Sequence, residues 1–266
     1  MVYAFFVSHW LLSVLFQSMF QHRYAAHKMY TMSPRTERVI HFLTWLVQGS
    51  SYLNPRGYAI LHREHHAFSD TERDPHAPGF HQNALAMMWR TKKRYDDYAH
   101  DRVLPEPRFD GDVPRWKLVD VTLGQSWPMR ILFCVAYAAF YFAFATHWWQ
   151  IAFMLPFHFV MGPVHGAIVN WCGHKYGYQS FDNGDKSRNT LLFDFVTFGE
   201  LFQNNHHKFG MSPNFAARWF ELDPTYQVMK VFHWVGIIDM GKKPQLARYP
   251  AVATTTSNEA VESEAA

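Results

Sequence analysis

The stretch "ILFCVAYAAFYFAFATHWWQIAFMLPFHFVMGPVHGAIVNWCGH" at residues 131–174 contains 44 residues without one Asp, Glu, Lys or Arg. About 20 apolar residues are enough for a helix to cross a bilayer, so this stretch is long enough for two spanning helices. The aromatic cluster "THWWQ" at residues 146–150 lies midway along it, and tryptophan prefers the membrane interface. The stretch therefore predicts a helical hairpin whose two ends lie on the same side of a membrane.

A second uncharged segment, residues 1–22, stands at the start of the chain and predicts one further spanning helix. A signal peptide is the alternative, but the segment has no basic start and no small-residue cleavage site before Arg23. The apolar run 39–53 is only 15 residues long, which favours an interfacial or buried helix. We therefore expect an all-α integral membrane protein with about three transmembrane helices.

The basic residues predict which side the hairpin ends face. If the run 39–53 stays on one side, residues 23–130 and 173–266 share a compartment that contains all 25 Lys and Arg. Cytoplasmic segments of membrane proteins carry an excess of Lys and Arg. We therefore expect this compartment to be the cytoplasm, in the inner membrane of a bacterium or an equivalent membrane, with the N-terminus and the hairpin tip outside.

The composition bounds the remaining choices. The chain of 266 residues is 48% hydrophobic, which predicts one domain over residues 1–249, and the polar end at 250–266 predicts a disordered tail. A formal net charge of +3, without basic runs interleaved with exposed aromatics, argues against nucleic acid as a partner. Cys134 and Cys172 lie in apolar stretches and form neither a C-x-x-C motif nor a disulfide framework.

The chain has 17 histidines, and several of them form clusters on the predicted cytoplasmic side. Residues three or four apart are neighbours on a helix, so one helical turn can present several imidazoles. Adjacent histidines differ by about 100° around a helix, so they serve two metals more easily than one, and His22 and His27 diverge by about 140°. Neutral imidazole suits iron, zinc, copper and nickel, so the ligand type leaves the metal open. We expect a dinuclear centre in a cytoplasmic helical cap, built from "HRYAAH" at 22–27, "HREHH" at 62–66, "NWCGH" at 170–174 and "QNNHH" at 203–207.

These motifs, in this order, resemble the histidine boxes H-x4-H, H-x-x-H-H and H/Q-x-x-H-H of the membrane fatty-acyl desaturases, of the acyl-CoA desaturase type. The resemblance continues through "HHAFSDTERDPH" at 65–76 and "NWCGHKYGYQSFDNGDKSRN" at 170–189, and it covers roughly residues 10–240. It implies a membrane enzyme with two iron ions that uses oxygen and two electrons to place a cis double bond in a fatty acyl chain. A delta-9 acyl-CoA desaturase is the specific expectation. Because the chain has no haem, flavin or cysteine-cluster motif, the electrons are expected from a b-type cytochrome or a ferredoxin with its reductase.

Carried over by position, the resemblance implies specific metal ligands. The acids Glu64, Asp70, Asp74 and Glu200 are candidates to accept hydrogen bonds from the ligating imidazoles. Gln203 stands where many relatives have a histidine, and it is an uncertain ligand. One iron would be held by His22, His62, His66 and His206, with Asn170 reaching it through a water, and the other by His27, His65, His174 and His207.

Candidates for substrate binding follow from their places beside the motifs. Basic residues near the boxes would bind the phosphates of the acyl carrier, and aromatic residues would line an apolar tunnel. Relatives of known organisation begin with two spans before the first box, whereas this chain has one, which leaves a groove for a partner or second subunit and is compatible with a homo-oligomer. The basic candidates are Arg63, Lys175, Lys186 and Arg188, and the aromatic ones are Trp45, Tyr52, Phe159 and Trp171.

Three other functions fit parts of the pattern. A membrane hydroxylase or ketolase with the same histidine boxes would differ only in its product. A zinc hydrolase would need fewer ligands and a general base such as Glu64. A metal transporter would place its ligands at mid-membrane depth, whereas the boxes lie in charged stretches beyond the ends of the predicted spans.

Overall fold

The computed structural model describes residues 1–192 and 194–241, so the tail predicted at 250–266 lies outside the described residues. The described part consists of helices and loops, and its β-structure is limited to three isolated bridges. Three of its helices are long and apolar enough to cross a membrane: Val2–Ala26, Trp127–Phe144 and Gln150–Gly173. These are the three spans expected from the uncharged segments of the sequence.

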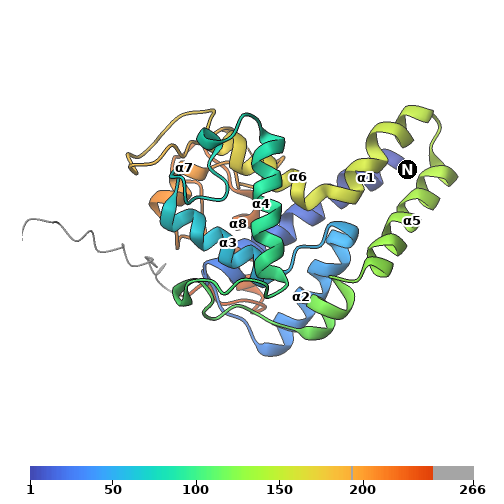
Figure 1. Ribbon diagram of the computed structural model, residues 1–266, viewed down its shortest axis with the longest axis horizontal. Helices are drawn as coiled ribbons and strands as arrows, with labels where there is room; N and C mark the ends of the chain where they lie inside the picture. The colour runs from blue at the N-terminus through green and yellow to red at the C-terminus, as the bar shows by residue number, and fades with distance from the viewer. Residues whose placement is uncertain (193, 242–266) are drawn as a thin grey trace, which may run out of the picture.

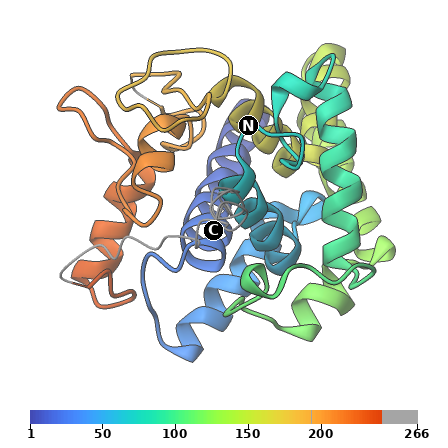
Figure 2. The ribbon, with the colours of Figure 1, turned by 60° about the vertical axis from the view of Figure 1, so that its left-hand side comes forward.

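The N-terminal span begins as an α-helix and ends as a π-helix. Helix α1 (Val2–Phe16) continues without a break into η1 (Gln17–Ala26). A π-helix is rare, and it occurs frequently at functional sites. Figure 2 shows this long helix in the middle of the molecule, with the segment that contains α7 and α8 on one side and α4 on the other.

The predicted hairpin is formed by α5 (Trp127–Phe144), the π-helical turn η6 (Gln150–Met154) and α6 (Leu155–Gly173). Only Tyr137 and Tyr141 of α5 are buried, and the apolar residues on its other faces are exposed. In a membrane these faces would contact lipid, which accounts for their lack of charge. Figure 1 shows α5 and the start of α6 beside the N-terminus, at the end of the molecule opposite α3, α4 and α7.

Helix α6 is kinked at Val160, three residues before Pro163. Proline has no N–H, so the carbonyl of Phe159, one turn earlier, loses its helical partner. The Ser50 hydroxyl lies 3.3 Å from that carbonyl and 3.2 Å from the carbonyl of His158, and it supplies the missing donor. Gly162 sits at the closest approach, because a Cβ there would lie 3.0 Å from the carbonyl oxygen of Ser51. The kink thus holds α6 against the turn that follows α2.

Four of the remaining helices, α2, α3, α4 and α8, begin at a polar capping residue. Ser33, Asn54 and Asp223 each precede a proline, and each side chain accepts a hydrogen bond from the first turn of its helix. Asn83 caps α4 in the same way without a following proline. The remaining helices are α2 (Pro34–Gln48), η2 (Gly49–Ser51), α3 (Pro55–Phe68), η3 (Pro78–Phe80), α4 (Ala84–Ala99), η4 (Pro107–Phe109), η5 (Leu118–Leu123), α7 (Gln203–Lys208) and α8 (Pro224–Trp234).

The main buried core lies around η1. Met19 and Phe20 of η1 are fully buried and belong to one apolar cluster with Ile40 of α2, Phe202 just before α7 and Met229 of α8. This cluster joins segments from both ends of the chain to the π-helix. It therefore places the histidines of η1 next to those of α7.

Candidate metal centre

The eight histidines expected as ligands lie together in two groups. In each group one nitrogen from every imidazole lies within 4.8 Å of the others. They come from η1 and its C-terminal cap, from α3, from the end of α6 and from α7. The first histidine group is His22, His27, His62, His66 and His206, and the second histidine group is His65, His174 and His207.

Both pairs of adjacent histidines divide between the two groups. His66 of α3 and His206 of α7 belong to the first group, whereas His65 and His207 belong to the second. Their positions follow from the rotation of about 100° between successive residues on a helix. The geometry thus has the form expected for a centre with two metals.

His27 lies in the first group, although the resemblance assigns it to the second metal. Its Nε2 is 2.7 Å from Nε2 of His62, and its ring centroid is 5.0 Å from that of His22. The separation of about 140° expected for His22 and His27 assumes an α-helix. The π-helix closes this turn with a bond from the His27 N–H to the His22 carbonyl at 3.1 Å, five residues back, so both rings point the same way.

Each imidazole of the second group donates a hydrogen bond from Nδ1 to a different carboxylate. His65 contacts Asp74 at 2.9 Å, His174 contacts Asp70 at 2.9 Å, and His207 contacts Asp185 at 2.7 Å. In a neutral imidazole, a proton on Nδ1 leaves the lone pair on Nε2. The carboxylates therefore select the tautomer that presents Nε2 to a metal.

The lone pairs of the second group converge on one point. Nε2 of His65 lies 3.2 Å from Nε2 of His207, and Nε2 of His174 is buried without a hydrogen-bond partner. Two lone pairs at this distance repel unless a cation lies between them. Burial lowers the pKa of His65, but Asp74 outweighs burial and the pKa is raised, so the site stabilises positive charge. The donors of this group fit a metal cation.

Three imidazoles of the first group are held in the neutral form that binds metals. Burial, together with the neighbouring histidines, holds the pKa values of His62, His66 and His206 well below the usual range. Nε2 of His206 lies 3.0 Å from Nε2 of His22 and 2.9 Å from Nε2 of His66. Five imidazoles with converging nitrogens, four of them buried and His66 part-buried, suit a first-row transition metal.

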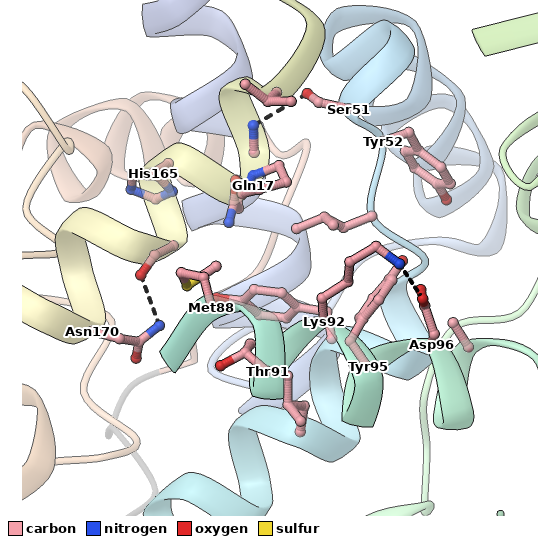
Figure 3. A pocket seen from close by; sticks show the side chains of 18 of the residues that line it. Gln17, Ser51, Tyr52, Met88, Thr91, Lys92, Tyr95, Asp96, His165 and Asn170 are labelled. Carbon is pink, nitrogen blue, oxygen red and sulfur yellow. Dashed lines mark hydrogen bonds and ion pairs between the residues drawn. The ribbon is translucent and has the colours of Figure 1, made fainter. Parts of the chain in front are cut away.

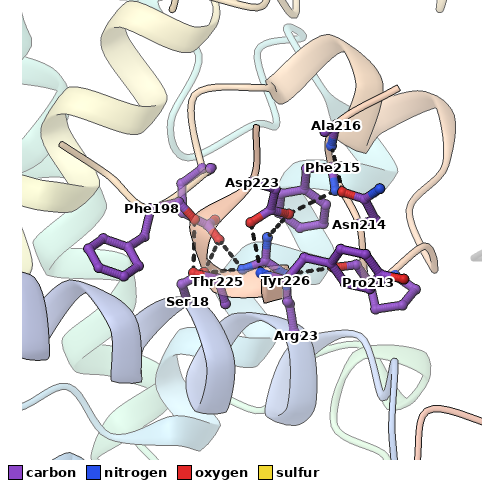
Figure 4. A network of polar contacts seen from close by, with 12 residues as sticks. Ser18, Arg23, Phe198, Pro213, Asn214, Phe215, Ala216, Asp223, Thr225 and Tyr226 are labelled. Carbon is purple, nitrogen blue, oxygen red and sulfur yellow. Dashed lines mark hydrogen bonds and ion pairs between the residues drawn. The ribbon is translucent and has the colours of Figure 1, made fainter. Parts of the chain in front are cut away.

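A buried arginine lies behind the first group, and Figure 4 shows Arg23 among Ser18, Asp223 and Phe215. Arg23 is fully buried, and its guanidinium pairs with Glu200 at 2.9 Å and Asp223 at 2.7 Å. It also lies 3.9 Å from the centroid of the Phe215 ring, which packs on His206. Glu200 in turn binds Nδ1 of His22. Burial alone would raise the pKa of Glu200, but His22 and Arg23 lower it to about 2, so the carboxylate stays charged.

Three of the four acids expected beside the histidines take that role, and one does not. Asp70, Asp74 and Glu200 each contact a ligand imidazole, whereas Glu64 pairs with Arg94 at 3.0 Å and accepts a hydrogen bond from Tyr98. Asp185 is the acid that sequence reasoning missed. It precedes His207 by 22 residues and no local pattern marks it.

Gln203 and Asn170 lie beside the groups and bond to backbone carbonyls. Gln203 is buried in the first turn of α7, and its Nε2 donates to the carbonyl of Glu200 at 2.6 Å. Its Cγ fills the space where Gly173 lacks a side chain, since a Cβ there would lie 2.5 Å away. Asn170 donates to the carbonyl of Gly166 at 2.9 Å. Both side chains line the cavity described next.

A cavity of about 890 Å³ lies against the first histidine group. His22, His62 and Glu200 form part of its wall, and the kink of α6 at Phe159–Pro163 forms another part. Figure 3 shows the cavity between α4, with Lys92 and Asp96, and the helices that carry Gln17 and His165. The cavity connects the candidate metal centre with the exposed basic end of α4.

Only two of the substrate-binding candidates expected from the sequence lie in the cavity wall. Tyr52 and Phe159 line the cavity, whereas Trp45 does not, although it packs in one core cluster with Tyr52. Arg63 is buried, and four of the five N–H donors of its guanidinium bond to backbone carbonyls, so it is not placed to bind a phosphate. Four further candidates, Trp171, Lys175, Lys186 and Arg188, are also absent from the cavity wall, although Lys175 lies 4.1 Å from the centroid of the Trp171 ring.

The sequence profile of the family described as fatty acid desaturase matches residues 1–233 of this chain. A palmitoyl-monogalactosyldiacylglycerol delta-7 desaturase of Arabidopsis thaliana is 27% identical over 88% of this chain and 60% of its own length. An acyl-CoA 5-desaturase of Anemone leveillei is 25% identical over 84% of this chain and 66% of its own length. The chain therefore spans less than two thirds of each of these two relatives.

A third desaturase is similar to this chain at higher identity. An sn-1 stearoyl-lipid 9-desaturase of Synechocystis is 32% identical over 69% of this chain and 54% of its own length. The family profile covers most of the chain, including all eight histidines of the two groups. From the converging imidazoles and these matches together we conclude that the chain belongs to the fatty acid desaturase family.

Proposed function

We propose that this chain is an oxygen-dependent desaturase that converts a long fatty acyl chain into its cis-unsaturated product at a di-iron centre. The observation that carries the proposal is the convergence of eight imidazoles, six of them buried and two part-buried, in two groups beside one cavity. Bound there, two irons would supply the oxygen chemistry, which consumes one dioxygen, two electrons and two protons and returns two waters with each double bond.

The residues of this chain would hold and orient the reaction partners. The two histidine groups would bind one iron each, and the carboxylates behind them keep the Nε2 lone pairs directed at the metals. His27 is assigned to neither iron, because it lies in the first histidine group, whereas the resemblance places it with the second metal. The cavity wall at Tyr52 and Phe159 would exclude water from the acyl chain and place one pair of carbons near the first group.

The acyl carrier would bind at the exposed end of the cavity on α4. The sequence "WRTKKR" at residues 89–94 gives this helix four basic residues in six. Lys92 lines the cavity there beside Asp96, and exposed Arg102 lines it just beyond the helix. Phosphate groups occur in coenzyme A, acyl-carrier protein and phospholipid, and basic side chains suit all three. We keep acyl-CoA and the delta-9 position as the specific proposal.

Three further proposals concern the setting of the enzyme. The electrons would come from a separate b-type cytochrome or a ferredoxin with its reductase. The chain would lie in a bacterial inner membrane or an equivalent membrane, with both histidine groups on the cytoplasmic side. A second copy of the chain or another membrane partner would cover the lipid-facing groove that a fourth span fills in related enzymes.

Two measurements test the proposed reaction. Cells that express the chain should accumulate a cis-monounsaturated fatty acid, identified by gas chromatography with localisation of the double bond. The purified protein should carry two irons per chain by elemental analysis. A hydroxylated or keto lipid product would instead support the hydroxylase or ketolase function, and one zinc without iron would contradict any oxygen-dependent function.

The proposed sidedness has its own test. Reporter fusions at residues 1, 100, 149 and 250 should give outside signals at 1 and 149 and cytoplasmic signals at 100 and 250. A cytoplasmic signal at 149 would contradict the hairpin, since its tip would then lie on the same side of the membrane as residues 100 and 250.

A further inference from the structure

Three polar side chains near the membrane-side end of the cavity have no partner in the described part of the protein. The Gln17 side-chain oxygen and both ring nitrogens of His165 are buried and make no hydrogen bond, and the same holds for the Ser13 hydroxyl. All three side chains are at least nine-tenths buried. The backbone of Thr197 approaches His165 without reaching hydrogen-bond geometry.

These side chains face one another across two helices that pack together. Ser13 and Gln17 are four residues apart at the junction of α1 and η1, so they lie on one face of the long helix. His165 belongs to α6, which packs along α1. Gln17 and His165 both line the cavity, and Figure 3 shows their side chains near each other on its wall.

A neighbouring glutamine shows that the protein does satisfy buried amides in this helix. Gln21 lies four residues after Gln17 and is also fully buried. Its amide donates to Leu53 and to Gln48, and it accepts a hydrogen bond from Gln48 at 2.7 Å in return. A buried polar group without a partner destabilises the folded state, so unsatisfied groups that line a cavity point to a ligand.

The donors and acceptors define the chemistry of that ligand. The Gln17 oxygen is an acceptor, and a neutral imidazole or a serine hydroxyl can both donate and accept. No side chain of the set carries a permanent charge, so the ligand is neutral. A hydroxyl group, which donates one hydrogen bond and accepts others, matches this set.

We propose that Gln17 and His165 form a hydroxyl-binding subsite in the cavity wall, beside the first histidine group, with Ser13 one helical turn before Gln17. Two sources share this chemistry: a hydroxyl on the acyl chain itself, or an ordered water. That the hydroxyl belongs to the acyl substrate rests on the proposed desaturase function. That the subsite binds a hydroxyl group or a water does not.

The first experiment compares the same substitution at two positions of one helix. Gln17→Leu, alone and with His165→Leu, removes groups that lack a protein partner, so the melting temperature of the purified protein in detergent should stay level or rise. Gln21→Leu breaks satisfied hydrogen bonds and leaves Nε2 of Gln48 without its acceptor, so it should lower the melting temperature by about 5 °C. This comparison requires no enzyme activity, so it stands even if the proposed function fails.

The second experiment identifies the source of the hydroxyl. The wild-type protein is given palmitoyl-CoA and a set of monohydroxypalmitoyl-CoA isomers in which the hydroxyl moves along the chain. A hydroxyl on the substrate is the source if one isomer is desaturated about tenfold more efficiently than palmitoyl-CoA and Gln17→Leu removes that advantage. Water is the source if no isomer is preferred and the double variant lowers kcat without changing KM for palmitoyl-CoA.

Two results would overturn the subsite. One is a fall in melting temperature for Gln17→Leu as large as that for Gln21→Leu, which would mean that Gln17 has a partner within the protein. The other is unchanged stability together with unchanged kcat, KM and isomer preference in the double variant. Failure of the wild-type protein to desaturate any of these substrates would contradict the proposed function instead.

Discussion

The two histidine groups are held in position by different means. In the second group each of the three imidazoles has its own carboxylate, Asp74, Asp70 or Asp185. In the first group, Glu200 holds His22, and Nδ1 of His206 is buried without a hydrogen-bond partner. His206 is oriented instead by packing on Phe215, under Arg23. A group in which every candidate ligand has its own carboxylate and a group in which His206 is oriented by packing should therefore respond differently to substitution.

Removal of one ligand from each group should have the largest effect. His206→Ala and His207→Ala should each abolish the unsaturated product, and each should lower the iron content from two toward one per chain, because each removes a ligand from a different group. Iron analysis and gas chromatography at equal protein level in membranes measure both effects. Retention of two irons by either folded variant would contradict the assignment of that histidine to a metal.

Changes to the carboxylates should have an intermediate effect. Loss of a group that orients a ligating histidine typically costs about 10- to 100-fold in metal affinity or activity. We expect Asp185→Asn and Asp74→Asn to be near the lower limit, because asparagine keeps an acceptor oxygen, and the alanine variants near the upper limit. Glu64→Gln is the matched control, since Glu64 contacts Arg94 and Tyr98. Iron retention against a chelator should be nearly unchanged in it.

The pH dependence of the metal-free protein should separate the groups. His62, His66 and His206 have lowered pKa values in the folded state, so below pH ~6.5 the unfolded chain binds more protons than the folded one. Their contribution should make stability fall with acid, by on the order of 1.4 kcal/mol per pH unit for each histidine.

The second group should contribute less to this slope, because the pKa values of His65 and His207 are shifted in opposite directions. The pKa of His65 is raised, so His65 adds stability at low pH that is lost as the pH rises through that value. Burial lowers the pKa of His207 to about 4, which acts in the opposite direction. Melting temperatures between pH 5 and 8 should therefore show a flatter acid slope for His66→Gln and a steeper one for His65→Gln. Equal slopes in both variants would contradict the comparison.

Gln203 should show the smallest effect on the centre. Its amide donates to the carbonyl of Glu200, and an amide binds iron weakly at best. Gln203→Ala should keep a measurable fraction of product, and Gln203→His should be tolerated. The product yield is compared with that of His206→Ala at matched expression. If Gln203→Ala were folded and equally inactive, Gln203 would have to be counted as a ligand.

The sequence determines the parts of this protein that depend on local pattern. The uncharged segments 1–22 and 131–174 predict the three spans, because hydropathy and helix length are properties of neighbouring residues. The spacing within "HREHH" and "QNNHH" predicts that adjacent histidines serve different groups, because the angle between neighbours on an α-helix is constant. The angle predicted between His22 and His27 is wrong, because the chain forms a π-helix there rather than an α-helix.

Only the tertiary structure decides which distant groups meet. Asp185 rather than Glu64 contacts a candidate ligand histidine. Arg63 donates to backbone carbonyls. Gln17 lines a cavity, whereas Gln21 forms hydrogen bonds with Gln48. Each outcome depends on contacts between segments that lie up to about 180 residues apart, such as His22 with Glu200. A charged or polar residue has the same local pattern whichever partner it finds, so its partner is set by how the helices pack.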